Sequence, residues 1–369
     1  MGEAPALKTF YSERVVRELA SDLARCGIDT AGFVEDCLDG LDALELTDRA
    51  RHIGRAMRAR LPAAPAEALD RLVQTLGPPH PTDELLGAGM EPFRYLPHVQ
   101  LIAELGPAAP EAGLRACYEV TKRFTAEFCL RAILDAAPEL TWAAIDRWVV
   151  DPDPHVRRLV SEGLRPRLPW APRLRSLVAD PTPAIARLDQ LVDDPAELVR
   201  RSVANHLGDI AKDHPDRAVA VATGWLAADP ARRRWVEYGL RHLVKTGHPG
   251  ALAALGFAAP AVRVEALVVP LRVTLGDTLV YSLTLASTGH EAQTLVVEAA
   301  VTFPKARGTS TKAFRAWKGE LVAGEQRPVS GRVNLRPLST RTQFPGTHTL
   351  AVVVNGVPLA QATFEVDPA

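Results

Sequence analysis

Residues 145–164, IDRWVVDPDPHVRRLVSEGL, align without a gap with residues 188–207, LDQLVDDPAELVRRSVANHL. The superposition sets Asp151 on Asp194, an offset of 43 residues (194 minus 151). A third copy of weaker register, GWLAADPARRRWVEYGL, places its aspartate, Asp229, 35 residues further on (229 minus 194). Each copy predicts a helix, an Asp-Pro turn and a second helix, which a proline can begin because the first helical turn needs no amide donor there. Repeats of this length are typical of HEAT-like solenoids, which offer a concave surface to a long ligand.

The pattern changes near residue 257. From Phe10 to about Leu255, apolar residues recur every three or four positions, in segments that end at proline or glycine. Later segments such as TLVYSLTLAS and HTLAVVVNG alternate and are rich in β-branched residues. We therefore predict a multidomain α plus β chain: an all-α HEAT-like repeat domain over residues 1–257, then an antiparallel, immunoglobulin-like sandwich of about seven strands over residues 258–369.

Composition narrows the class of protein. The 369 residues are 47% hydrophobic and 24% charged, and no apolar run approaches the roughly 20 residues of a membrane span. The N-terminus lacks the apolar core of a signal peptide, and the four cysteines have no ligand-like spacing. We expect a cytoplasmic protein without membrane contact. The formal net charge of -1 makes any argument for DNA binding a local one.

Common cofactor and metal motifs do not occur in the sequence. It has no P-loop, no GxGxxG after a strand, no HExxH and no GxSxG. His206 and His214 lie eight residues apart without a third ligand at useful spacing. We expect no cofactor and no metal.

The helix after Asp153 has two contrasting faces on a helical wheel of about 100° per residue. Its apolar stripe is Val156, Leu159, Val160, Gly163 and Leu164, and its opposite face is Arg158, Ser161, Glu162 and Arg165. The matching face of the next repeat carries Arg201, Asn205, Gly208 and Lys212, with Asp209 one turn beyond Asn205. One interpretation is a solvated surface with ordinary ion pairs. The other is a basic track for phosphates, because arginines such as Arg157 and Arg234 also crowd successive repeats.

Three further positions keep two interpretations each. Trp170 follows LRPRLP and is either held by the prolines outside the helical stripe or a core tryptophan at a repeat junction. Glu127 has Arg123 and Arg131 four residues to either side, so it forms a structural ion-pair triplet or takes part in catalysis, and it is ionised in both cases. The run PKARGTSTKAFRAWKGE from Pro304, with a loop tip over 308–310, is a solubilising loop or an arm that clamps DNA.

Three segments carry a resemblance to a known family. RRLVSEGLRPRLPW, RRSVANHLGDIAKDHP and TKRFTAEFCLRAIL resemble the HEAT-like-repeat alkylpurine DNA glycosylases of the AlkC and AlkD group. The AlkC branch is more similar, because some of its members carry a C-terminal immunoglobulin-like domain. The resemblance implies a monofunctional glycosylase that excises N3-alkylated bases, such as 3-methyladenine with 3-methylcytosine as a further candidate, without flipping the nucleotide as most such enzymes do.

The resemblance also assigns residues. It places Glu127, Glu162 and Asp209 at the acidic positions of the family's cleft, Trp170 at the aromatic one, and Arg158 and Arg165 beside them. Gly208 departs from the family, in which we expect a polar residue, often asparagine, at this position.

The chemistry suits these residue types. A cationic base is already a good leaving group, so the remaining task is to stabilise an oxocarbenium-like sugar and align water, as carboxylates do in glycoside hydrolysis. An indole face attracts cationic character. We therefore expect four catalytic residues, Glu127, Glu162, Asp209 and Trp170. The expected DNA-binding residues are Arg158, Arg165, Arg201, Lys212, Arg234, Lys305, Arg307 and Lys312. The expected partner is double-stranded DNA with alkylated bases, bound by a monomer; the alternative is a non-catalytic HEAT-repeat scaffold for DNA or protein.

Overall fold

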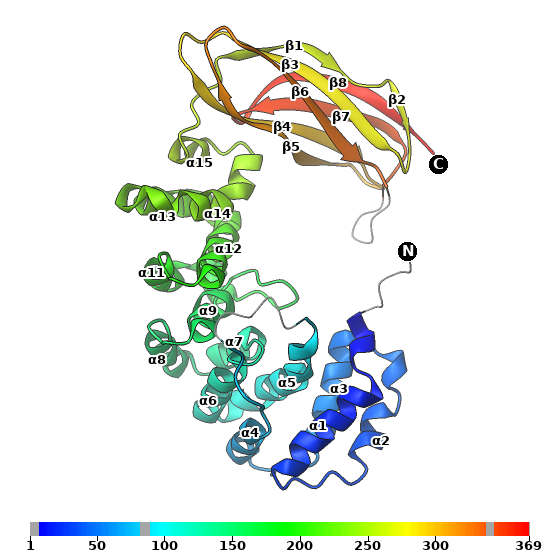
Figure 1. The fold of residues 1–369 in the computed structure, drawn as a ribbon, viewed down its shortest axis with the longest axis vertical. Helices are drawn as coiled ribbons and strands as arrows, with labels where there is room; N and C mark the ends of the chain where they lie inside the picture. The colour runs from blue at the N-terminus through cyan, green and yellow to red at the C-terminus, as the bar shows by residue number, and fades with distance from the viewer. Residues whose placement is uncertain (1–6, 82–88, 337–342, 369) are drawn as a thin grey trace. The chain divides into compact units, whose positions relative to one another are not determined.

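A computed structural model describes residues 7–81, 89–336 and 343–368. A helical part is followed by a β domain (Figure 1), so the predicted fold class is confirmed. By internal contacts the chain divides into two compact units, residues 1–209 and 210–369. Within the described ranges, no helix is both long and apolar enough to cross a membrane.

The first unit consists of helices in two rows. In the first row α3, α5, α7 and α9 pack in succession, and in the second row α4 packs on α6 and α6 on α8. The α-helices that begin in this unit are α1 (Glu13–Arg25), α2 (Phe33–Leu38), α3 (Leu46–Arg58), α4 (Pro65–Gln74), α5 (Leu96–Leu105), α6 (Pro110–Thr121), α7 (Glu127–Ala136), α8 (Pro138–Trp148), α9 (Pro154–Gly163), α10 (Arg175–Ala179), α11 (Thr182–Leu191) and α12 (Glu197–Asp213). Two rows of this kind are the layered arrangement of HEAT-like repeats.

The Asp-Pro turns have the same geometry in all three copies of the repeat. Asp151, Asp194 and Asp229 each accept, through Oδ1, the backbone amide two residues further on, at 2.8, 2.8 and 2.9 Å. This local bond lets an aspartate close a turn. Arg157 adds a link between copies, because its Nε and Nη2 donate to the two carboxylate oxygens of Asp194 at 2.5 and 2.9 Å.

The second unit contains the end of α12, three more α-helices and a β-sandwich. The helices are α13 (Pro215–Ala228), α14 (Arg233–Lys245) and α15 (Pro249–Ala254). The strands are β1 (Val262–Val268), β2 (Arg272–Thr274), β3 (Thr278–Ser287), β4 (Gln293–Pro304), β5 (Thr309–Leu321), β6 (Gln326–Asn334), β7 (Gly346–Val354) and β8 (Val357–Asp367). Because these helices group with the sandwich by their contacts, the domain boundary at residue 257 stays a prediction.

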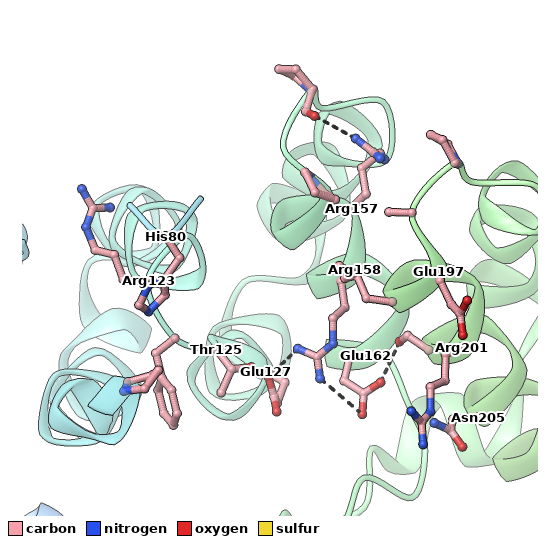
Figure 2. A pocket seen from close by; sticks show the side chains of 18 of the residues that line it. His80, Arg123, Thr125, Glu127, Arg157, Arg158, Glu162, Glu197, Arg201 and Asn205 are labelled. Atoms are coloured by element: carbon pink, nitrogen blue, oxygen red, sulfur yellow. Dashed lines mark hydrogen bonds and ion pairs between the residues drawn. The ribbon is translucent and has the colours of Figure 1, made fainter. Parts of the chain in front are cut away.

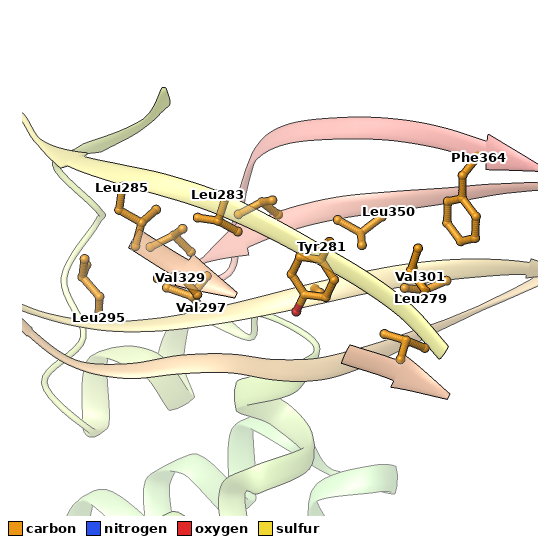
Figure 3. Close-up of a cluster of buried hydrophobic side chains, with 14 of the residues drawn as sticks. Leu279, Tyr281, Leu283, Leu285, Leu295, Val297, Val301, Val329, Leu350 and Phe364 are labelled. Atoms are coloured by element: carbon orange, nitrogen blue, oxygen red, sulfur yellow. The ribbon is translucent and has the colours of Figure 1, made fainter. Parts of the chain in front are cut away.

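The two sheets have the orders β1-β3-β6 and β2-β8-β7-β4-β5. Eight strands are present among the described residues, where about seven were expected, and the short β2 pairs with β8 in parallel while the other pairs are antiparallel. Leu279, Tyr281, Leu283 and Leu285 alternate along β3 and lie in the core between the sheets (Figure 3). Alternation buries every second side chain of a strand, and this is the signal by which the sequence indicated the sandwich.

The basic run after Pro304 is a hairpin and an edge strand. The turn closes where the amide of Lys305 donates to the carbonyl of Gly308 at 3.0 Å, and β5 begins at the next residue. The expected loop tip over 308–310 is therefore wrong: Gly308 ends the turn, with φ 72°, and Ser310 already pairs with Phe303 in the sheet. Strand pairing continues along Thr- and Lys-containing sequence that composition alone assigned to a loop.

Candidate active-site groove

A groove of about 1040 Å³ opens in the first unit (Figure 2). It is lined by residues of α7, α9, α12 and the segments that precede them, and by residues of the chain between α4 and α5. Its charged lining residues are Arg123, Glu127, Arg157, Arg158, Glu162, Glu197 and Arg201, and its other lining residues include His80, Phe93, Phe124, Ser202 and Asn205. The lining thus brings four guanidinium groups together with three carboxylates.

Glu162 lies at the last turn of α9 and is almost fully buried, with 7% of its surface exposed. Its Oε1 accepts from Nη1 of Arg165 at 2.6 Å, and its Oε2 accepts from the hydroxyl of Ser202 at 2.6 Å. Burial alone would raise the pKa of this carboxyl, but the charges of Arg158 and Arg165 and the two hydrogen bonds hold the pKa below its usual value. The solvated-surface interpretation is therefore wrong, and Glu162 is a buried carboxylate.

Arg165 joins two of the expected acids. Besides the bond to Glu162, its Nε donates to Oδ2 of Asp209 at 2.8 Å, and Asp209 is only 2% exposed. Helix α9 ends at Gly163, so Arg165 lies in the turn beyond it and can reach α12. The helical wheel placed Arg165 on the helix. Because α9 ends at Gly163, Arg165 lies beyond the helix and contacts the next repeat instead.

Gly163 allows α9 to approach α7 closely. A Cβ built on Gly163 would lie 2.8 Å from Cδ2 of Leu130 on α7. Glu127, at the first turn of α7, thereby comes near Glu162, and Arg158 lies between the two acids (Figure 2) at 3.9 Å from an oxygen of each. A larger residue at position 163 would separate the helices that carry the acids.

Glu127 differs from Glu162 in its hydrogen bonds. It is 8% exposed, and its Oε2 has no hydrogen-bond partner among the residues that the structure describes. Burial raises the pKa of Glu127, with the Arg158 charge acting against that shift and the Glu162 charge adding to it. The pKa of Glu127 is therefore shifted in the direction opposite to that expected for an acid with two guanidinium partners, and Glu127 holds its proton to a higher pH than an ordinary glutamate.

The expected triplet of Glu127 with Arg123 and Arg131 is also wrong. Helix α6 ends at Thr121 and α7 begins at Glu127, so Arg123 is not on the helix of Glu127 and donates instead to Glu119 at 2.9 Å. Arg131 donates to backbone carbonyls, among them that of Arg165 at 2.7 Å. Both interactions are structural, and they leave Arg158 as the cation beside Glu127.

Trp170 lies in the exit after α9 and is 80% exposed, so the alternative of a core tryptophan is excluded. Its φ of 65° is a left-handed conformation that is uncommon for a bulky residue. Among the described residues, Arg165, Asp209 and Trp170 are outside the groove lining, while Glu127, Arg158, Glu162 and Arg201 are part of it.

The remaining expected DNA-binding residues are exposed. Arg201 lines the groove, and Lys212, Arg234, Lys305, Arg307 and Lys312 belong to the second unit. Arg157, counted in the basic track, is instead committed to Asp194 between repeats.

Sequence reasoning missed two polar residues of α12, Ser202 and His206, both buried next to the acids. Comparison of the two copies of the repeat could have identified these two residues. With the offset of 43, Ser202 and His206 take the stripe positions that Leu159 and Gly163 occupy in the previous copy. A polar residue at a core position of one repeat, where the other repeat has none, indicates a function specific to that repeat.

A HEAT-like helical array with a basic, carboxylate-bearing groove, followed by an immunoglobulin-like sandwich, defines the class of this protein. Residues 263–368 match the family model described as the C-terminal Ig-like domain of the uncharacterised protein YhaZ. The chain is 31% identical over 366 residues to "Uncharacterized protein YhaZ" of Bacillus subtilis (strain 168), covering 98% of this chain and 99% of the relative.

A solved structure is similar over the same length. The Pseudomonas fluorescens alkylpurine DNA glycosylase AlkC, bound to DNA containing an abasic site analog, matches with a TM-score of 0.89 and 33% identity, covering 98% of this chain and 100% of that one. The chain belongs to the AlkC branch of the HEAT-like-repeat AlkC and AlkD family, together with YhaZ. The predicted family is thus confirmed.

Proposed function

We propose that this protein is a DNA repair glycosylase that hydrolyses the N-glycosidic bond of cationic N3-alkylated bases in duplex DNA without flipping them. 3-Methyladenine is the expected substrate, with 3-methylcytosine as a further candidate. The observation that carries the proposal is the Arg158–Glu162–Arg165–Asp209 network, of which Arg158 and Glu162 line the groove. The similarity to AlkC, whose structure contains DNA, supports the same activity.

In the proposed reaction the bond between C1′ and the base nitrogen breaks, and the bonding electrons leave with the base, which becomes neutral. Glu162, whose lowered pKa keeps it anionic, stabilises the positive charge that develops on the sugar. Water adds to C1′ and releases one proton to solvent as the hydroxyl forms. No strong general acid is needed, because the alkylated base already carries a positive charge before the bond breaks.

Asp209 would act through Arg165. Asp209 is buried and bound to Nε of Arg165, and the same guanidinium holds Glu162. Without Asp209, Arg165 would lose one of two anionic partners and Glu162 its fixed orientation. Small displacements of a catalytic group reduce rates strongly.

Glu127 would respond to the substrate. Its raised pKa means that Glu127 takes up a proton more readily in the free protein than an ordinary glutamate does. A cationic base or sugar in the groove would favour the carboxylate by Coulomb attraction. Such a group gives charged lesions a larger stabilisation than neutral ones.

The remaining expected residues would bind DNA. Trp170 would place its exposed indole against a sugar or base, and Arg158, Arg165 and Arg201 would supply positive charge in the first unit. In the second unit the candidates for phosphate contacts are Lys212, Arg234, Lys305, Arg307 and Lys312.

The test compares the release of 3-methyladenine from methylated duplex DNA by the unaltered protein and by Asp209→Ala. We expect the variant to lose release by about 100-fold or more while its affinity for duplex DNA changes little. A non-catalytic scaffold gives the opposite pattern: no release by either protein, and loss of binding when groove arginines such as Arg201 are replaced.

A further inference from the structure

Two hydroxyl groups in series, one from α9 and one from α12, lead to the Glu162 carboxylate. The hydroxyl oxygen of Ser161 lies 2.7 Å from that of Ser202, and the hydroxyl of Ser202 lies 2.6 Å from Oε2 of Glu162. All three residues are buried. Ser161 and Glu162 belong to α9 and Ser202 to α12, so this series of hydrogen bonds crosses from one repeat to the next and back.

The direction of these hydrogen bonds is fixed by proton count. An ionised carboxylate can only accept hydrogen bonds, so the Ser202 hydroxyl must donate its single proton to Glu162. The 2.7 Å contact between the two hydroxyls then requires the proton of Ser161, whose hydroxyl oxygen also lies 3.0 Å from the carbonyl oxygen of Arg158. The order Ser161 to Ser202 to Glu162 is the arrangement in which each donor has an acceptor.

The neighbouring histidine steadies the same segment. Nδ1 of His206 lies 2.8 Å from the carbonyl oxygen of Ser161 and therefore carries the proton that it donates. Burial lowers the pKa of His206 to about 4, so the ring is neutral at pH 7. Ser202 and His206 thus both contact the last turn of α9, one at the carboxylate and one at the backbone.

We propose that Ser202 is a positioning residue of this site: its hydroxyl, oriented by Ser161, holds the Glu162 carboxylate in place across the interface between two repeats. Arg165 holds Oε1 and Ser202 holds Oε2, so both oxygens have a donor. Packing does not require a serine at this position, because the equivalent residue of the previous repeat is Leu159. The role in base release rests on the proposed function; the effect on Glu162 does not.

Other titratable and charged groups around Glu162 influence its ionisation together with Ser202. They are Arg158 on the same helix, Arg165 beyond it, Glu127 on α7, and His206 and Asp209 on α12. Arg158 and Arg165 favour the carboxylate, whereas the negative charge of Glu127, when it is ionised, opposes it. Removing the Ser202 donor leaves all of these unchanged, so a change in Glu162 titration would report the hydroxyl itself.

The experiment uses the full chain and three variants. Ser202→Ala removes the donor, and Ser202→Thr keeps a hydroxyl at the same position. Thr141→Val is the matched control, because Thr141 is a fully buried hydroxyl of α8 that bonds to the carbonyl of Ala137. Two readouts are measured: the ¹³C titration of the Glu162 carboxyl, assigned by its loss in Glu162→Gln, and the pH dependence of single-turnover 3-methyladenine release.

We expect Ser202→Ala to move the Glu162 titration, and with it the acid limb of base release, to higher pH. The plateau rate falls about ten- to 100-fold because the carboxylate is less well oriented, while affinity for abasic-site DNA stays the same. Ser202→Thr restores the titration, and Thr141→Val does not alter it.

A Glu162 titration in Ser202→Ala that coincides with that of the unaltered protein would overturn the proposal. So would an equal shift in Thr141→Val, which would indicate a general loss of packing. If the unaltered protein released no base while the titration still moved in Ser202→Ala, the glycosylase proposal would fail and the positioning of Glu162 would be upheld.

Discussion

The second helices of the two clearest repeats, α9 and α12, share a scaffold and differ in what they bury. Both follow an Asp-Pro turn, and both carry an arginine, Arg157 or Arg200, that donates to the carbonyls of that turn. Yet α9 presents Glu162 where α12 has Asn205, and α12 presents Ser202 where α9 has Leu159. The shared residues hold the repeats together, and the residues that differ complement one another across the interface. A repeat protein can thus build an asymmetric site from nearly identical units.

The largest effect should follow from removing the charge of Glu162, since α12 has Asn205 instead of an acid at the equivalent position. Glu162→Gln keeps the size of the side chain but removes the anion and one of its two acceptor oxygens, so it can accept from Arg165 or from Ser202 but not from both. We expect base release to fall by about 100- to 1000-fold, equivalent to roughly 3 to 4 kcal/mol of transition-state stabilisation. Single-turnover assays on methylated duplex DNA measure this. Asn205→Asp, which adds an acid to α12 instead, should not restore base release when it is combined with Glu162→Gln. Recovery of base release in this double variant would contradict the proposed difference between α9 and α12.

The next largest effect concerns the ion pair between Arg157 and Asp194, which links the two repeats. Arg157→Ala leaves the buried Asp194 without its bidentate partner. We expect the variant to lose about 3 kcal/mol in the free energy of unfolding, seen as a lower denaturation midpoint. Arg201→Ala, which removes an exposed arginine from the adjacent position of the next repeat, should change stability by less than about 0.5 kcal/mol. Similar losses in both variants would contradict a specific role for the inter-repeat pair.

Arg158 and Arg201 are equivalent positions of the two repeats and should separate chemistry from binding. Arg158 lies between two carboxylates, whereas Arg201 is exposed in the groove lining. Arg201→Ala should weaken DNA binding and reduce the slope of log affinity against log salt by about one, while the single-turnover rate at saturation is retained. Arg158→Ala should lower that rate. An unchanged salt slope for Arg201→Ala would remove Arg201 from the DNA-binding residues.

The smallest effect is a change of stability with pH. The pKa of Glu127 is raised on folding, so the folded protein binds the proton more tightly than the unfolded chain does. Its contribution to stability is fully present below the unfolded pKa and is lost as the pH rises through the folded pKa. Glu127→Gln removes this loss, so its stability relative to the unaltered protein should increase from pH 4 to pH 8. Denaturant midpoints over that range measure the difference, and a decrease would mean that Glu127 is held as a carboxylate.

The sequence predicted the scaffold better than the contacts of the site. Periodicity and the 43-residue offset predicted the helices, and alternation predicted the sandwich, because both patterns follow directly from which side chains are buried. The pairing of Glu162 with Arg165 was also expected. Its burial was not, since a helical wheel shows one helix and not the neighbour that covers its second face.

Two other errors came from element ends. The partners predicted for Glu127 assumed one helix through Arg123, whereas the chain breaks between α6 and α7. The link from Arg165 to Asp209 depends on where α9 ends, and helix ends are the least certain part of a pattern-based prediction. In each case a shift of a few residues at a helix end decided which charged groups meet.

The exposed side chain of Trp170 provides an optical probe. Of the six tryptophans, all in described segments, it alone is exposed, while Trp148 and Trp225 are buried and the others are partly covered. A small collisional quencher should therefore act first on the emission of this indole. Protection of that emission when duplex DNA is added would report contact at the exit of α9 directly, in solution, with no label attached.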